Sequence, residues 1–542
     1  MRKISNHHLF VAFLLTGGLF ILVLTLFQPF YNTDADIYFL YTLSGGYGNP
    51  PSELLHYYLG AHPVLGVVIS MLFRFFPMFN WYTFSLLLFH FISCVALLMM
   101  FLKFYRRTYA IGFFLIFFLF IESRLLLRLN FSGTALMGVI SGTVSLLLYY
   151  KGRAGGKSDS RWQHYLLALL IIIAGLIRIH YLVLFGAFAS WMALFYLPHR
   201  EFVKYFKVLV VLAGIVFLCF LGQRYYYQHK IPGWKHEEKM RQAYFNIHNH
   251  SHKESPVTGN GLEKLREELI GISFLYDKNF TGFEEIKKFS KNNVRRFNLV
   301  PQNYQAFYWL FIDMRVYILL IAGAILFFVM SWNIPQLKRF IYMSFFSLVA
   351  FLGICFFFKV TEVILLAFLA SVLISAVLCL ADNNGNKKQP LAAGVLITAL
   401  GCFWMISRLI KEDSRSRPGV TNARNVIREL NSHPDILFVD AGTHFNFHLS
   451  IWDNPANYPI RNLVYNELLL SNSYSQQLKR HGVEDLMKEL PVKDNIYLVG
   501  EKASLLVEYY KQLFNQSVVV KKVPGFRYID AYQLRISDYK QN

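Results

Sequence analysis

The sequence predicts an all-α polytopic membrane bundle of about eleven transmembrane helices, followed by a small C-terminal α/β domain outside the membrane. Of the 542 residues, 55% are hydrophobic and only 16% are charged, whereas soluble domains carry about 25% charged residues. Apolar runs close to the roughly 20 residues that a membrane-spanning helix needs also recur along the first three quarters of the chain. Lipid is therefore the expected surrounding of most helices.

Eleven apolar runs are interpreted as transmembrane helices. They lie at about 9–29, 81–103, 109–122, 131–150, 164–178, 181–197, 207–222, 316–332, 341–358, 361–380 and 391–410. A further run, 61–77, contains Arg74 and is bounded by two prolines. The lysines and arginines that follow every second span form a consistent cytoplasmic set only if 61–77 does not cross the bilayer. That run is therefore expected to lie in the outer interface or to re-enter the membrane from the outside.

This arrangement predicts a multi-pass protein of the cell membrane, with a cytoplasmic N-terminus and an extracytoplasmic C-terminus. Residues 1–410 are the predicted transmembrane domain, with outer loops at 30–80 and 223–315, and residues 411–542 are the extracytoplasmic domain. In that last part, strand-like runs at 436–440, 496–499, 517–523 and 528–535 alternate with helix-like runs at 419–431 and 501–513. Such alternation indicates a small α/β domain.

The formal net charge of +21 does not predict a nucleic-acid partner. No zinc-knuckle spacing or RNP-like motif accompanies the charge, and basic loops next to a lipid bilayer account for it. The five cysteines stand singly in apolar runs, which predicts neither a disulfide nor a metal site from them. Three alternating histidines, His248, His250 and His252, lack the further ligands of a tetrahedral site and are interpreted as part of a hydrophilic loop.

The first outer loop holds two carboxylates directly after the first span. Asp34 and Asp36 stand two residues apart at the expected membrane surface. An ionised carboxylate there can take a proton from an acceptor hydroxyl, and two together can hold a divalent cation against a phosphate. The alternative is that both residues merely end the first helix and solvate the loop.

A wider pattern surrounds these carboxylates. Asp34 is followed by Tyr38, and the run His62–Gly66 reads His-Pro-Val-Leu-Gly. The pattern resembles the GT-C class of glycosyltransferases, which use polyprenyl-phosphate-linked sugars. The first element looks like the Asp-Glu-x-x-Tyr of aminoarabinose transferases, and the second like the His-Pro-Pro-Leu-Gly of protein O-mannosyltransferases. The chain departs from them at Ala35 and Val64, so either carboxylate of the loop can be the catalytic one.

Arg178 is the first candidate for binding the donor phosphate. It lies in the predicted outer turn between the fifth and sixth spans, where the GT-C pattern often has a basic residue. Arginine is preferred for bidentate phosphate contacts. The alternative is an arginine whose long side chain only snorkels to the interface.

Three further basic residues at predicted outer turns are candidates for the same role. Arg124 and Arg128 are four residues apart and share a helix face, and one of them can instead pair with Glu122. Lys359 lies in the turn before the tenth span and can simply pair with Glu362.

The resemblance implies an inverting glycosyltransferase at the outer membrane face. It would move a sugar from a polyprenyl-phosphate donor to a glycan, lipid or protein acceptor, with Asp34 or Asp36 as general base and Arg178 on the leaving phosphate. Tyr38 and His62 belong to the expected substrate loop. No cofactor is required, and a divalent metal is optional.

Three rivals remain at this stage. A transporter or flippase of lipid-linked glycans would place charges along a path at mid-membrane depth. A polymerase or ligase of surface polysaccharide would use the same kind of donor. A receptor or scaffold explains the C-terminal part but not the acidic loop.

Overall fold

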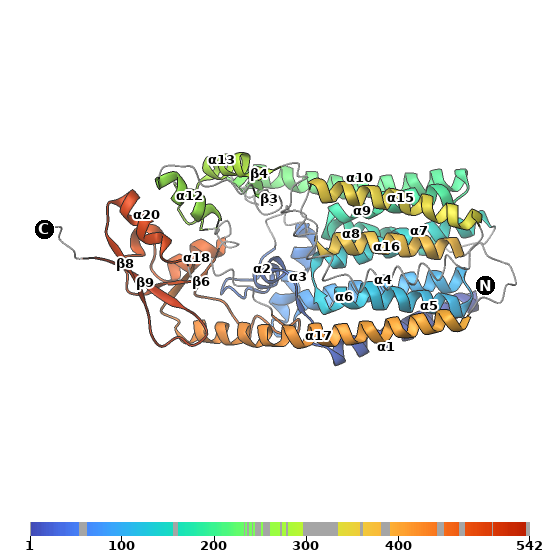
Figure 1. The fold of residues 1–542 in the computed structure, drawn as a ribbon, viewed down its shortest axis with the longest axis horizontal. Helices are drawn as coiled ribbons and strands as arrows, with labels where there is room; N and C mark the ends of the chain where they lie inside the picture. Colours follow the sequence, from blue (N-terminus) through green and yellow to red (C-terminus); the bar gives the residue numbers. More distant parts are fainter. Residues whose placement is uncertain are drawn as a thin grey trace.

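The structure is a computed structural model. It describes residues 2–53, 62–155, 161–231, 233–235, 238–240, 242–243, 251–252, 261–271, 274–277, 280–295, 334–357, 361–380, 391–441, 449–465, 472–500 and 502–537. Long helices run side by side along most of the molecule, and a β-sheet lies at the end farthest from the N-terminus (Figure 1). The two chain ends therefore lie at opposite ends of the bundle axis.

Eight helical stretches of the described residues are long and apolar enough to cross a membrane, which makes this a multi-pass membrane protein. They are α1 (Arg2–Leu26), α4 (Trp81–Phe104), the continuous run of α5 (Arg107–Phe117), η2 (Phe118–Glu122) and α6 (Ser123–Leu127), α7 (Phe131–Ala154), α9 (Ile179–Tyr196), α10 (His199–Lys230), α15 (Ile334–Phe357) and α16 (Glu362–Leu380). Two predicted spans coincide with other helices, α8 (Arg161–Ile177) and α17 (Leu391–Ser432). The predicted span 316–332 lies outside the described residues, so the count of eleven stays a prediction.

Helix α7 is the centre of the bundle. All of its membrane-spanning window is buried, whereas only 22% of the window of α1 is. Small residues make this packing possible: a side chain at Gly138 would collide with Phe89 of α4, and one at Gly142 would collide with Ile171 of α8. Close approach through small residues is the usual way in which membrane helices associate. Helix α7 is consequently closely packed against its neighbours, and the residues of its first turn are buried as well.

Two short helices, α2 (Asp34–Ser44) and α3 (Pro63–Phe75), lie at the end of the bundle that faces the sheet (Figure 1). The 13 residues of α3 span about 20 Å at 1.5 Å per residue, which is less than the roughly 30 Å hydrocarbon core. One side of α3 is buried, through Gly66 and Phe73 among others. The other side exposes Val68 and Phe75. This geometry fits the predicted interfacial position of 61–77.

The C-terminal region contains a five-stranded mixed sheet in the order β6-β5-β7-β9-β8. Its strands are β5 (Leu437–Asp440), β6 (Leu463–Val464), β7 (Ile496–Val499), β8 (Val518–Lys522) and β9 (Ala531–Ile536), with helices α18 (Asn472–Arg480), α19 (Leu486–Glu489) and α20 (Leu505–Phe514). Strands β6, β5 and β7 are parallel, and β9 is antiparallel to both of its neighbours. Four of the strands coincide with the four strand-like runs of the sequence.

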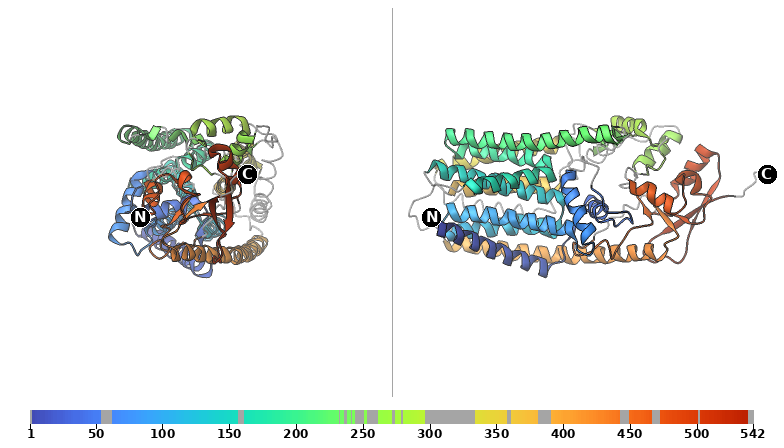
Figure 2. Two further views of the ribbon diagram at one scale, coloured as in Figure 1. Left: turned by 90° about the vertical axis from the view of Figure 1, so that its left-hand side faces the viewer. Right: turned by 180° about the vertical axis from the view of Figure 1, so that it is seen from behind.

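Helix α17 connects the bundle to the sheet without interruption. It runs for 42 residues with Pro418 inside it, and it follows one side of the molecule along most of its length (Figures 1 and 2). The helix-like run 419–431 is helical, as the sequence indicates, and forms the last part of α17. Proline removes one hydrogen bond and tends to bend a helix, but here it does not end it. The boundary expected after residue 410 falls within this helix.

The described parts of the second outer loop pack on the sheet. Helices α12 (Gly261–Gly271) and α13 (Phe283–Asn293) share a hydrophobic core with β5, β7 and α20. Two tyrosines add polar links: Tyr276 donates to the Val464 carbonyl at 3.1 Å, and Tyr509 donates to the Asp277 carboxylate. The second outer loop and the C-terminal region thus form one structural unit beyond the end of the bundle.

Candidate active site at the start of helix α7

A short parallel ladder brings the first outer loop to the start of α7. Strand β1 (Phe30–Tyr31) pairs with β2 (Arg128–Leu129), which directly precedes α7. The next residue, Asn32, donates its backbone N–H to the Leu129 carbonyl at 3.1 Å. These bonds join two segments about 100 residues apart in sequence. They place the acidic loop against the first turn of the central helix.

Asp36 lies buried in the first turn of α2, with its side chain fully inside the protein. Its Oδ1 accepts a hydrogen bond from the Tyr82 hydroxyl at 2.7 Å and one from the Phe131 backbone N–H at 2.9 Å. Its Oδ2 accepts from the hydroxyl of Thr33, the N-cap of α2. Each of these three hydrogen bonds to the carboxylate comes from a donor, as an ionised carboxylate requires.

Burial raises the pKa of Asp36 to about 6 from an ordinary value of 3.8, because a carboxylate loses its hydration inside the protein. The hydrogen bonds from Thr33, Tyr82 and Phe131 and the positive charge of Arg178 oppose that rise. At pH 7 a group with this pKa is about nine-tenths ionised. Asp36 is thus mostly ionised near neutral pH, and its pKa lies closer to 7 than that of a surface aspartate. Both properties suit general base catalysis.

Arg178 occupies the turn between α8 and α9, where it is the N-cap residue of α9. Its Nη1 donates to the Ser132 hydroxyl at 2.9 Å. The guanidinium lies over the ring of Phe131 at 4.9 Å and near that of Tyr181 at 5.9 Å. The structure gives this guanidinium no carboxylate partner among the described residues. Aromatic faces hold a cation while leaving its donors available for an anion.

The first two residues of α7 therefore hold both predicted groups. Phe131 binds Asp36 through its backbone N–H and supports Arg178 with its ring, while Ser132 binds Arg178 through its hydroxyl. Neither contact was expected from the sequence, because Phe131 and Ser132 carry no motif and belong to an ordinary apolar span. A base and a cation are thus brought together at the end of the bundle that faces the C-terminal region.

The other residues of the expected substrate loop have different positions. Asp34 begins α2, and its side chain lies outside the described residues. Tyr38 is buried, with its ring 6.4 Å from that of Tyr47. His62 caps α3: its Nδ1 accepts from the Val64 backbone N–H at 3.2 Å, and its Nε2 lies 3.2 Å from the Cys219 carbonyl. Burial lowers the pKa of His62, so a neutral imidazole holds α3 against α10.

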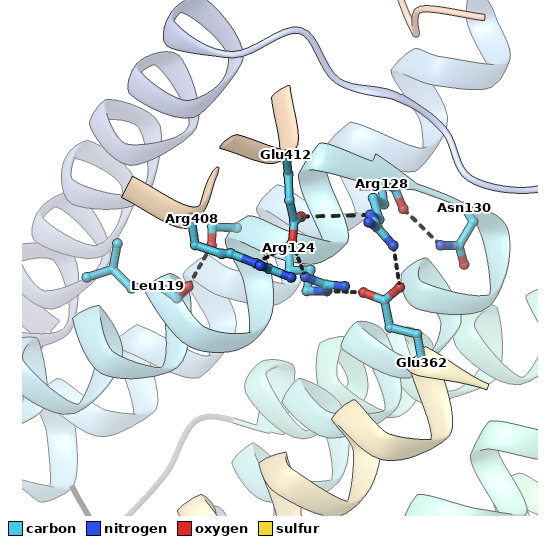
Figure 3. A network of polar contacts seen from close by, with 8 residues as sticks. Leu119, Arg124, Arg128, Asn130, Glu362, Arg408 and Glu412 are labelled. Carbon is cyan, nitrogen blue, oxygen red and sulfur yellow. Dashed lines mark hydrogen bonds and ion pairs between the residues drawn. The ribbon is translucent and has the colours of Figure 1, made fainter. Parts of the chain in front are cut away.

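Arg124 and Arg128 belong to an ion network rather than to the Asp36 site (Figure 3). The buried guanidinium of Arg124 pairs with Glu362 and, at 2.5 Å, with Glu412. Arg128 pairs with Glu362 at 3.0 Å, and Arg408 reaches Glu412 at 3.3 Å. The network ties α6 to α16 and α17. The carboxylates of Glu362 and Glu412 neutralise most of the positive charge of the arginines in this network.

Two pairings considered from the sequence are wrong or lie outside the described residues. Among the described residues Glu122 pairs with no arginine. It contacts His90 of α4 at 2.8 Å, and residues two apart, such as Glu122 and Arg124, do not face each other on a helix. Glu362 pairs with Arg124 and Arg128, and Lys359 lies outside the described residues. Within those residues, no three His, Cys, Asp or Glu side chains gather as a metal site would require.

The C-terminal region contacts the same loop. Tyr31 donates its backbone N–H to the Leu449 carbonyl at 3.0 Å, and the Asn80 side chain donates to the Asp453 carbonyl at 3.1 Å. Arg424 of α17 grips the Asp453 carboxylate through two nitrogens. The segment after the first strand of the sheet is therefore part of the wall around the loop that carries Asp36.

Comparison with known proteins gives one structural likeness. No family model matches the chain, and no curated protein does. The fold is similar to the crystal structure of ArnT from Cupriavidus metallidurans in the apo state, with a TM-score of 0.45 and 12% sequence identity, over 96% of this chain and 97% of that one.

Proposed function

We propose that this chain is a membrane glycosyltransferase that moves a sugar from a polyprenyl-phosphate donor to an acceptor hydroxyl at the outer membrane face. One observation carries the proposal. Asp36, a buried base, and Arg178, a cation without a carboxylate partner in the described structure, are held by adjacent residues of one helix start. Transfer from a phosphate leaving group needs a base for the acceptor and a positive charge for the phosphate.

The proposed reaction is a single displacement. The acceptor oxygen attacks the anomeric carbon, and the bond from that carbon to the phosphate oxygen breaks with its electron pair going to the phosphate. Asp36 takes the proton of the acceptor hydroxyl, and the configuration at the anomeric carbon inverts. The donor phosphate gains one negative charge as the sugar leaves, and Arg178 stabilises this charge. The transfer needs no cofactor, and a divalent cation beside the phosphate is compatible with it.

The contacts around the Arg178 guanidinium support this role. Phe131 and Tyr181 offer ring faces and Ser132 one hydroxyl, so the guanidinium keeps further N–H groups for a ligand. An oriented cation in a partly buried site stabilises a developing charge more than a mobile surface cation does. An arginine whose side chain merely snorkels to water would need no such contacts.

The surroundings suit a lipid-linked donor. The exposed apolar side of α3, with Val68 and Phe75, lies at the same end of the bundle as α2 (Figure 1). A polyprenyl chain in the outer leaflet can therefore approach the site without leaving the hydrocarbon. The acceptor would arrive from the aqueous side, where Asp453 and its neighbours line the loop.

The test measures release of polyprenyl phosphate by purified protein in nanodiscs that contain a panel of polyprenyl-phosphate sugars and acceptors. Arg178→Ala is expected to lower kcat by about 10²–10³-fold, and Arg178→Lys to restore only part of it, because an ammonium lacks the planar fork of donors. Arg74→Ala is the matched control: Arg74 also lies at this end of the bundle, and within the described part of the chain its guanidinium donates to the Pro51 carbonyl alone. Equal loss in both alanine variants, or none in either, would contradict the assignment.

A further inference from the structure

A buried polar chain connects three membrane helices just below the site. His90 of α4, Glu122 of η2 and Thr134 of α7 have no exposed surface. His90 Nδ1 lies 2.8 Å from Glu122 Oε1, and His90 Nε2 lies 3.0 Å from Thr134 Oγ1. Ionisable residues inside a bundle are costly and are kept for a reason. The mechanism above uses none of these three.

Hydrogen-bond directions determine how many protons the chain holds. The Thr134 hydroxyl donates its one hydrogen to the Asn130 carbonyl at 2.9 Å, so its oxygen must accept from His90 Nε2–H. The short contact between His90 Nδ1 and Glu122 Oε1 then contains one shared proton. The pair is imidazolium with carboxylate or imidazole with carboxylic acid. Neither arrangement carries a net charge, so burying the pair in a low-dielectric interior costs less free energy than burying an isolated ion.

The chain ends on the residue that organises the start of α7. Asn130 is the N-cap of that helix, and its Oδ1 accepts from the Gly133 backbone N–H at 2.6 Å. Its Nδ2 donates to the Arg128 carbonyl at 2.9 Å. The next two residues, Phe131 and Ser132, are the ones that hold the catalytic base and the cation.

We propose that Glu122, His90 and Thr134 are positioning residues that fix the first turn of α7, and through it the Phe131 N–H on Asp36 and the Ser132 hydroxyl on Arg178. The importance of this positioning for catalysis rests on the proposed function, whereas the positioning itself rests on the hydrogen bonds alone. The polar chain is separate from the ion network. Glu122 contacts His90, whereas Arg124, two residues later and so on the opposite side of the helix, contacts Glu362.

The first experiment compares Thr134→Val with Thr134→Ser. Valine keeps the shape and removes the hydroxyl, whereas serine keeps the hydroxyl. The readout is the pH titration of the Asp36 carboxyl in the infrared, identified as the signal that disappears in Asp36→Asn. The titratable groups around Asp36 are Tyr31, Tyr82 and Arg178, and neither variant changes them.

Thr134→Val is expected to raise the pKa of Asp36 by about half a unit or more, a roughly threefold change in its proton dissociation constant. The reason is that the Phe131 N–H bond, which lowers this pKa, weakens when the helix start loosens. Thr134→Ser should titrate like the wild type. An unchanged titration in Thr134→Val would overturn the proposal, as would equal shifts in both variants.

A second pair keeps the proposal testable if Thr134→Val does not fold. His90→Gln retains a donor near the position of Nε2 and can still reach Thr134, whereas His90→Asn loses it. The pKa of Asp36 should shift in His90→Asn and stay unchanged in His90→Gln. A shift in His90→Gln with none in His90→Asn would refute the positioning role. These readouts need no substrate. If the shifts appear but no polyprenyl donor is ever turned over, the positioning role stands and the proposed function fails.

Discussion

Replacing Asp36 by asparagine should make the protein more stable while removing its activity. The side chain is fully buried and accepts hydrogen bonds on both oxygens. An asparagine can keep all of them: its Oδ1 accepts from Tyr82 and Phe131, and its Nδ2 donates to the Thr33 hydroxyl. What disappears is the negative charge, and with it the cost of keeping that charge out of water.

The size and pH range of this gain follow from the pKa of Asp36, which is about 6 in the folded protein and 3.8 ordinarily. Two pKa units correspond to about 3 kcal/mol. The folded protein binds this proton more tightly than the unfolded chain, so the wild type loses stability as pH rises from about 4 to about 6. The variant should not show this loss. The stability of the variant relative to the wild type should therefore be unchanged near pH 4, increase with pH, and reach its full gain at about pH 7.

The measurement is thermal unfolding of both proteins in nanodiscs at matched pH values between 4.5 and 7.5, followed by turnover at pH 7. We expect a melting-temperature difference that grows with pH, and turnover lower by about 10²–10⁴-fold, the usual scale for a positioned base. A variant that melts lower than the wild type at pH 7 would refute the account of Asp36 as a destabilised buried carboxylate. Full activity in the variant would refute its role as base.

Three further predictions follow from the same geometry. The turnover rate of the wild type should rise with pH through about 6, the pKa of Asp36, because only the ionised carboxylate accepts a proton; a pH-rate profile that is flat from 5 to 7.5 would contradict this. Arg124→Met leaves Glu362 and Glu412 without their buried partner and should cost about 3–5 kcal/mol of stability, with donor affinity in the folded fraction unchanged; weaker binding of polyprenyl phosphate at unchanged stability would instead place Arg124 in the donor site. Tags on the two chain ends should be accessible from opposite sides of the membrane, as their places at opposite ends of the bundle indicate, and labelling of both from the same side would break the predicted topology.

The helices and strands could largely be predicted from the sequence, because each depends on a local pattern. Runs of about 20 apolar residues identify spanning helices, and short alternating runs identify strands such as β7 and β8. The domain boundary is harder to place. The end of the apolar run near residue 410 marks where the sequence becomes polar, but α17 continues through a charged run and Pro418 to Ser432, since neither charged residues nor a proline must end a helix.

The site could be predicted only in part, since its contacts join distant segments. A carboxylate after the first span and an arginine at an outer turn are visible in the sequence. That both meet at Phe131 and Ser132 is not, because nothing local distinguishes these two residues from others in an apolar helix. Arg124 is also a candidate for the phosphate from the sequence alone. Its partner Glu412 lies 288 positions away, and only the fold shows that the charge is already matched.

The most direct test of the central claim is a structure of the protein in nanodiscs with bound polyprenyl phosphate, the leaving group of the proposed reaction. We predict that phosphate oxygens lie within about 2.7–3.2 Å of the Arg178 guanidinium nitrogens, on the side of Phe131 that also carries Asp36. Phosphate density at the Arg124 network, or anywhere that leaves Arg178 bound only to Ser132, would contradict the assignment of this site.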